Sequence, residues 1–207
     1  MSLRCCGIGL LISMFVLALA TNTFDRHEDR TNPNRAASQS SGPVNGESLY
    51  QLASEWTTDQ GRHLKLEDLR GGTRVLAMMF TQCPSLCPTL VRDLKAVDAA
   101  MPADVRARME YVLVTIDPEH DDATALKAFR DRMRLDHRWL LLRGNAGDTQ
   151  QLAAVLGFNY GKGDGRNYTH SNLVTVLDGE GAIVHQQVGL GADLGRAVAV
   201  IQEARAR

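Results

Sequence analysis

The stretch VLAMMFTQCPSLCP, residues 75–88, decides the fold of this chain. It opens with six consecutive apolar residues, a run that suits a strand covered on both faces of a sheet. Two cysteines follow, and an amphipathic stretch comes next, with Leu90, Val91 and Leu94 at helical spacing before Pro102. The pattern predicts a buried strand, a cysteine pair at its end and a helix that begins beside that pair.

The residues that follow predict an α/β domain. Tyr111–Ile116 is a second apolar run, which gives a strand–helix–strand unit with a right-handed crossover. The other predicted elements are helices at 123–133, 149–156 and 193–205, a short strand at 139–142, a hairpin of strands 173–177 and 183–188, and an N-terminal hairpin of segments 49–56 and 63–66. This order predicts a thioredoxin-like, three-layer α/β/α fold with an N-terminal β-hairpin extension. In such sheets, sites lie beyond the carboxyl ends of the parallel strands.

Residues 1–48 differ in composition from the predicted domain. Residues 1–20 combine a basic residue, an apolar run and small residues, the pattern of a signal peptide or an N-terminal membrane anchor. Membrane attachment through residues 5–23 is the alternative to cleavage. Residues 21–48 are polar and predict a disordered tether. We therefore expect an exported protein with its folded domain at residues 49–207.

Charge and cysteine usage narrow the chemistry. The net charge is −1 and no basic stripe is present, which excludes a nucleic-acid partner. Of four cysteines, Cys5 and Cys6 lie in the export segment, so Cys83 and Cys87 are the one pair in the domain. A disulfide between residues four apart closes a small loop and stabilises little, so the pair is interpreted as chemical.

The local sequence indicates how this pair would react. Pro84 and Pro88 are expected to hold Cys83 and Cys87 out of regular helix. A helix N-terminus favours thiolate, and cysteine pKa values there can fall from about 8.5 to roughly 3.5–7.5. Thiolate serves both disulfide exchange and the binding of a soft metal such as Cu(I) or zinc, so both readings stay open.

A metal would need a third ligand, for which histidine is the natural candidate. His170 precedes strand 173–177 and His120 follows strand 111–116, so both are expected near the cysteines. An ordinary polar loop residue remains the alternative for each. Met78 and Met79 are adjacent on a strand and point to opposite faces, which favours core packing over ligation.

Three segments, FTQCPSLCP (80–88), VTIDPEHDD (114–122) and YTHSN (168–172), resemble the Sco/SenC family of copper-binding proteins that help to assemble the copper A centre of cytochrome c oxidase. The resemblance spans residues 48–205. It implies one copper per domain, Cu(I) or Cu(II), held by Cys83, Cys87 and His170. Asp117 and Asp121 match the family's acidic positions and could orient a ligand, although Asp121 or Asp122 could instead cap the following helix.

The resemblance favours one function, and the cysteine pair leaves a second one open. The first is a copper chaperone that delivers the metal to the copper A-bearing oxidase subunit or to another copper acceptor. The second is an exported thiol–disulfide reductase in which Cys83 and Cys87 form the redox-active pair and a thiol reductant restores them. Either would be periplasmic, soluble or anchored to the inner membrane. Ser85 and Thr169 stand where the family often has Asp, which predicts weaker retention of Cu(II).

Overall fold

The structure is a computed structural model that describes residues 48–164, 168–188 and 194–204. These residues all belong to one compact unit that covers residues 36–207. The predicted signal segment and nearly all of the predicted tether lie outside the described residues. Among the residues described, no helix is long and apolar enough to cross a membrane.

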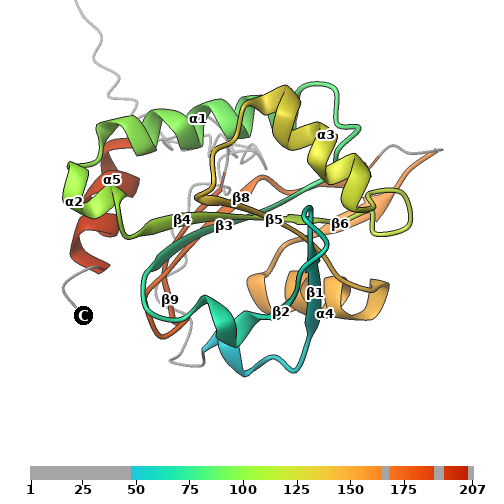
Figure 1. Cartoon of the computed structure of the whole chain (residues 1–207), viewed down its shortest axis with the longest axis horizontal. Coiled ribbons are helices and arrows are strands. Elements are labelled where there is room, and N and C mark those ends of the chain that lie inside the picture. The colour runs from blue at the N-terminus through green and yellow to red at the C-terminus, as the bar shows by residue number, and fades with distance from the viewer. Residues whose placement is uncertain (1–47, 165–167, 189–193, 205–207) are drawn as a thin grey trace, which may run out of the picture. The chain divides into compact units, whose positions relative to one another are not determined.

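The described residues form a seven-stranded sheet and a separate two-stranded sheet (Figure 1). The large sheet has the order β2-β1-β5-β4-β3-β8-β9. Its strands are β1 (Glu55–Thr58), β2 (His63–Lys65), β3 (Thr73–Met79), β4 (Met109–Thr115), β5 (Trp139–Arg143), β8 (Leu173–Leu177) and β9 (Ile183–Val188). The small sheet pairs β6 (Tyr160–Lys162) with β7 (Tyr168–His170).

Five α-helices accompany these strands in the described part of the chain. They are α1 (Leu86–Ala100), α2 (Ala103–Arg106), α3 (Ala123–Met133), α4 (Ala146–Leu156) and α5 (Leu194–Ala204), with 3₁₀ turns η2 (Leu49–Gln51) and η3 (Leu66–Leu69). Figure 1 shows α1 and α3 on one face of the large sheet and α4 on the other. The fold is therefore the three-layer, thioredoxin-like α/β fold that the sequence predicts.

The central strands of the large sheet are parallel and buried. β3, β4 and β5 run parallel, and all seven residues of β3 are buried, as a strand with helices on both faces requires. Met78 and Met79 are 2% and 1% exposed, which confirms their assignment to the core. Because these strands are parallel, the loops after β3 and β4 leave the sheet at the same edge.

The structure differs from the predicted elements in several places, among them the unpredicted short helix α2 and the start of α4 at Ala146, three residues earlier than predicted. Residues 49–51 form a 3₁₀ turn, so the first strand of the N-terminal hairpin begins only at Glu55. The glycine-rich segment 157–170, for which the sequence predicts no helix or strand, contains β6 and β7. Its glycines hide the alternation that marks a strand, so periodicity could not find this hairpin. Helix α1 begins at Leu86, beside the cysteine pair as predicted, and it includes Cys87.

Candidate metal centre

The candidate site lies where β3 and β4 end, and β7 brings in its third member. Cys83 follows β3 and Asp117 and Asp121 follow β4, so parallel strand direction alone places these three at one edge. His170 is the last residue of β7, far along the chain from the cysteines. The ligand atoms of Cys83, Cys87 and His170 all lie within 4.8 Å of one another.

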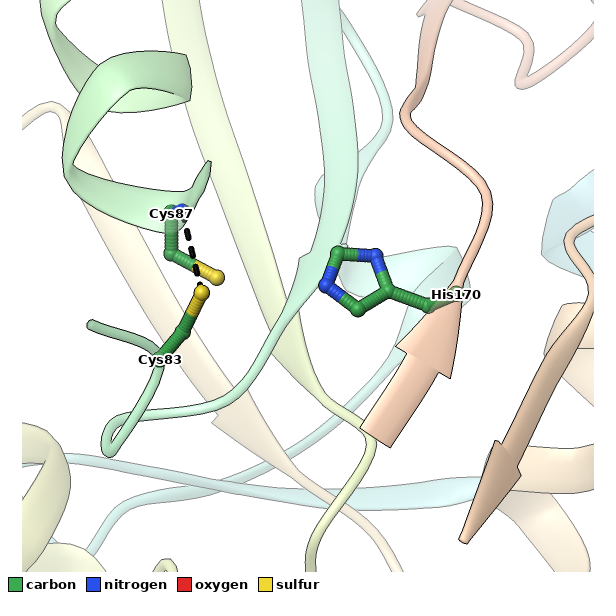
Figure 2. Close-up of side chains that lie close together, drawn as sticks. All are labelled: Cys83, Cys87 and His170. Carbon is green, nitrogen blue, oxygen red and sulfur yellow. Dashed lines mark hydrogen bonds between the residues drawn. The ribbon is translucent and has the colours of Figure 1, made fainter. Parts of the chain in front are cut away.

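The cysteine loop closes through its own backbone and one sulfur. The Cys83 amide donates to the Phe80 carbonyl at 3.2 Å. The Cys87 amide donates to the Cys83 sulfur, also at 3.2 Å, so that sulfur accepts from a free N–H of the first helical turn (Figure 2). Cys87 is the second residue of α1, so the expectation that Pro88 would hold it out of regular helix is wrong. Pro88 sits in the first turn, where its missing N–H costs no hydrogen bond.

Both thiols are free and buried, with Cys83 6% and Cys87 1% exposed. Burial raises the pKa of the Cys87 thiol well above its usual range, and the neighbouring Cys83 side chain adds to this. The expectation of a lowered pKa is therefore wrong for Cys87, because the loss of hydration outweighs the field of the helix N-terminus. Without a metal, Cys87 is a neutral thiol.

His170 turns its ring edge toward the two sulfurs, as Figure 2 shows. Its Nδ1 lies 3.0 Å from the carbonyl oxygen of Ser171. Since a carbonyl only accepts, Nδ1 carries the proton and Nε2 keeps a free lone pair for a metal. The ring stacks on Phe158 and meets Phe80 edge-on, with centroid distances of 5.9 Å in both cases. These contacts fix the ring plane.

The donor set fits a soft metal ion. Bonds of about 2.3 Å to sulfur and about 2.0 Å to nitrogen place three ligands of one ion roughly 4 Å apart. The three donor atoms therefore need shifts of well under an ångström each. Two thiolates and an imidazole favour copper or zinc over a hard cation such as magnesium.

Asp121 ties the cysteine loop to β4 and does not cap a helix. Its buried carboxylate accepts hydrogen bonds from the Thr81 amide at 2.9 Å and from the hydroxyls of Thr81 and Thr115. The cap of α3 is Asp122, which accepts from the Ala125 amide at 2.8 Å. Thr81 leads directly into the cysteine loop, so Asp121 holds the start of that loop against the sheet.

Asp117 forms a second anchor, on the histidine side of the site. Its carboxylate, 1% exposed, accepts from Nδ1 of His120 at 2.8 and 3.0 Å and from the Tyr168 hydroxyl at 3.1 Å. Burial raises the pKa of Tyr168 to about 12, and the hydrogen bond to Asp117 adds to this effect. The hydroxyl therefore stays protonated and can donate. Tyr168 was not identified from the sequence. It lies two residues before His170, so on a strand the two side chains share one face, and this spacing could have indicated its role.

His120 lies outside the cysteine cluster. With Asp117 and Glu119 it forms a separate group whose ligand atoms lie within 4.8 Å of one another. Glu119 also pairs with Lys162 at 3.1 Å. Asp117 and Glu119 of this group line an open hollow of about 450 Å³, as does Tyr168, whereas Cys83, Cys87 and His170 do not.

Comparison with known proteins relates this chain to one family. The SCO1/SenC family profile matches residues 45–203. The "Putative copper-binding protein" of Stutzerimonas stutzeri is 32% identical over 94 residues, 45% of either chain. The chain spans about half the length of the curated relatives that it matches.

Solved structures show the same fold. A SCO1/SenC family lipoprotein from Bacillus anthracis superposes with a TM-score of 0.68 at 20% identity, covering 78% of this chain and 96% of that one. Bradyrhizobium japonicum ScoI with copper bound gives a TM-score of 0.62 at 19% identity, with coverages of 73% and 96%.

Proposed function

The chain belongs to the SCO1/SenC family, and from that premise we propose that it binds one copper ion through Cys83, Cys87 and His170 and delivers it to a protein acceptor. The observation that carries this proposal is the convergence of two sulfurs and one imidazole, from segments far apart in the chain, within 4.8 Å. Solved relatives with copper bound share the fold.

Charge supports copper in either oxidation state. Two thiolates and a neutral imidazole leave −1 around Cu(I) and zero around Cu(II), so neither state buries a large uncompensated charge. Three ligands also leave one coordination position for an incoming ligand. His170 is half-buried while both cysteines are buried, so an acceptor would approach from the histidine side.

The acceptor proposed is the copper A-bearing subunit of cytochrome c oxidase or another exported copper protein. Delivery outside the cytoplasm is consistent with the predicted export segment and with the lipoprotein relative from Bacillus anthracis. A thiol reductant would be needed there, because only the reduced pair binds copper. Weaker Cu(II) retention, from Ser85 and Thr169, stays a prediction; both side chains are exposed.

Disulfide exchange is the second candidate, favoured by the proximity of two free thiols. A reductase needs Cys83 and Cys87 but has no use for a histidine ligand. The buried, protonated state of Cys87 disfavours it as the attacking thiol, because the thiolate is the nucleophile. Cys83 would have to attack, with Cys87 resolving the mixed disulfide.

Replacement of His170 separates the two functions. We expect His170→Ala to weaken copper binding at least 100-fold, measured by competition with a Cu(I) chelator, and to leave dithiol–disulfide exchange with a small disulfide within about threefold. His137→Ala, at an exposed position, is the matched control and should keep wild-type values for both. Wild-type copper affinity in His170→Ala would refute the three-ligand site.

A further inference from the structure

Tyr168 connects the strand of His170 to the interior of the protein. Its hydroxyl donates to the buried Asp117 carboxylate at 3.1 Å, and its ring packs against Phe80 with a centroid distance of 5.2 Å. Asp117 follows β4, and Phe80 leads into the cysteine loop. A single side chain thus reaches both parallel-strand ends from which the site is built.

This link matters because β7 is not part of the large sheet. It has three residues, and among the described residues it pairs only with β6, in a separate two-stranded ladder. The residue after it, Ser171, bonds to Asn159 beyond α4 and not to β3 or β4. The nearest backbone pairing with β3 is that of Val174 in β8 with Ala77, four residues beyond His170. That pairing brings the strand close to the cysteine loop, and side-chain contacts set the remaining distance.

Asp117 is a rigid partner for this purpose. The Asp117 amide donates to the Thr115 hydroxyl at 3.0 Å, which fixes the backbone where β4 ends. Its carboxylate is held from the other side by His120 at 2.8 Å. An acceptor clamped at both ends restricts the donor hydroxyl, and with it the strand that carries the donor.

We propose that Tyr168 is a positioning residue that, through its hydrogen bond to Asp117, holds His170 at ligating distance from Cys83 and Cys87. The inference rests on the proposed copper site and deepens it. Tyr168 does not touch the metal; it acts through the placement of its neighbour on the same face of β7.

The test is removal of one hydroxyl. Tyr168→Phe keeps the ring against Phe80 and removes only the bond to Asp117. We expect about tenfold weaker Cu(I) binding in chelator competition, and a weaker nitrogen coupling in the electron paramagnetic resonance spectrum of the Cu(II) form. Tyr160→Phe is the matched control: it makes the same change on the partner strand, where the hydroxyl makes no hydrogen bond to the described residues. It should leave both readouts unchanged.

A mutant cycle distinguishes positioning from general loosening of the site. In a His170→Ala background, Tyr168→Phe should have no further effect on the remaining copper affinity, because no imidazole is left to position. Asp117→Ala, which removes the acceptor of this hydrogen bond, is the second variant and should reproduce the loss seen with Tyr168→Phe. Equal losses with and without His170, or wild-type affinity and spectrum in Tyr168→Phe, would overturn the proposal. If the spectrum of the wild-type protein showed no nitrogen ligand, the proposed copper site itself would be refuted, independently of the role of Tyr168.

Discussion

At Cys87, a metal must compete with a proton. Because burial holds the Cys87 pKa far above neutrality, the thiol is protonated until copper displaces that proton. We expect copper uptake to release at least one proton, so the apparent affinity should rise at least tenfold for each unit of increasing pH between 6 and 8. Calorimetry in buffers of different ionisation enthalpy measures the number of protons directly.

The His170→Ala variant is the control for this measurement, since it retains both thiols and should release the same cysteine protons even though it binds more weakly. Copper affinity that stayed constant between pH 6 and 8 would show that Cys87 either does not bind the metal or is already ionised.

At the scale of single elements, the ends of α3 and α4 differ in a way that affects stability. Both helices end on a residue in the left-handed conformation: Arg134, with φ of 51°, after α3 and Gly157, with φ of 68°, after α4. Glycine adopts this conformation without strain, whereas a residue with a Cβ is strained there by about 1 kcal/mol. We expect Arg134→Gly to raise the free energy of unfolding by about 0.5–1 kcal/mol, measured by urea denaturation.

The converse change should have the opposite sign. Gly157→Ala meets no atom within 4 Å of the added Cβ, so conformational strain alone should lower the free energy of unfolding, by about 1 kcal/mol. Arg134→Ala is the control for the first variant, because alanine keeps the strain and should not stabilise. Stabilisation by Arg134→Ala equal to that by Arg134→Gly would point to loss of the arginine charge instead.

At the scale of the whole domain, one buried ion pair joins the N-terminal hairpin to the rest. Asp59, in the turn between β1 and β2, accepts from two nitrogens of the Arg130 guanidinium on α3, and the two side chains are 2% and 12% exposed. We expect Asp59→Ala to cost about 3 kcal/mol of unfolding free energy, because it leaves a buried cation without its counter-charge. Asp131→Ala, which breaks an exposed pair with Lys127, should cost under about 0.5 kcal/mol.

Chemical denaturation of both variants decides between these values. A cost below about 1 kcal/mol for Asp59→Ala would mean that the carbonyl oxygens of Asp136 and Trp139, which Arg130 also contacts, are enough to hold the charge. In that case strand pairing between β1 and β5, the buried Trp56 and the bond from the Asp59 amide to Leu141 would be enough to attach the hairpin.

The apolar runs and helical repeats predicted most of this architecture without any structure. Continuous runs such as that of β3 can be read locally, since a strand buried on both faces excludes polar residues throughout its length. Parallel strands also share an edge, so the meeting of Cys83 with the segment after β4 followed from strand order. Residue type and spacing also predicted that the cysteine pair is chemical and not structural, but they left metal binding and disulfide exchange both open.

The tertiary structure decided what depends on contacts between distant segments. It showed that His170 lies beside the sulfurs, whereas His120 is hydrogen-bonded to Asp117. The sequence had placed both histidines at the same edge of the sheet and could not choose between them. It assigned Asp121 to the cysteine loop and Asp122 to the helix cap, a choice between neighbours that spacing could not make. It reversed the pKa expected for Cys87, and it revealed Tyr168 as the link between β7 and the interior. Hydration, burial and side-chain partners are properties of the packed molecule, so no local pattern around the cysteines could encode them.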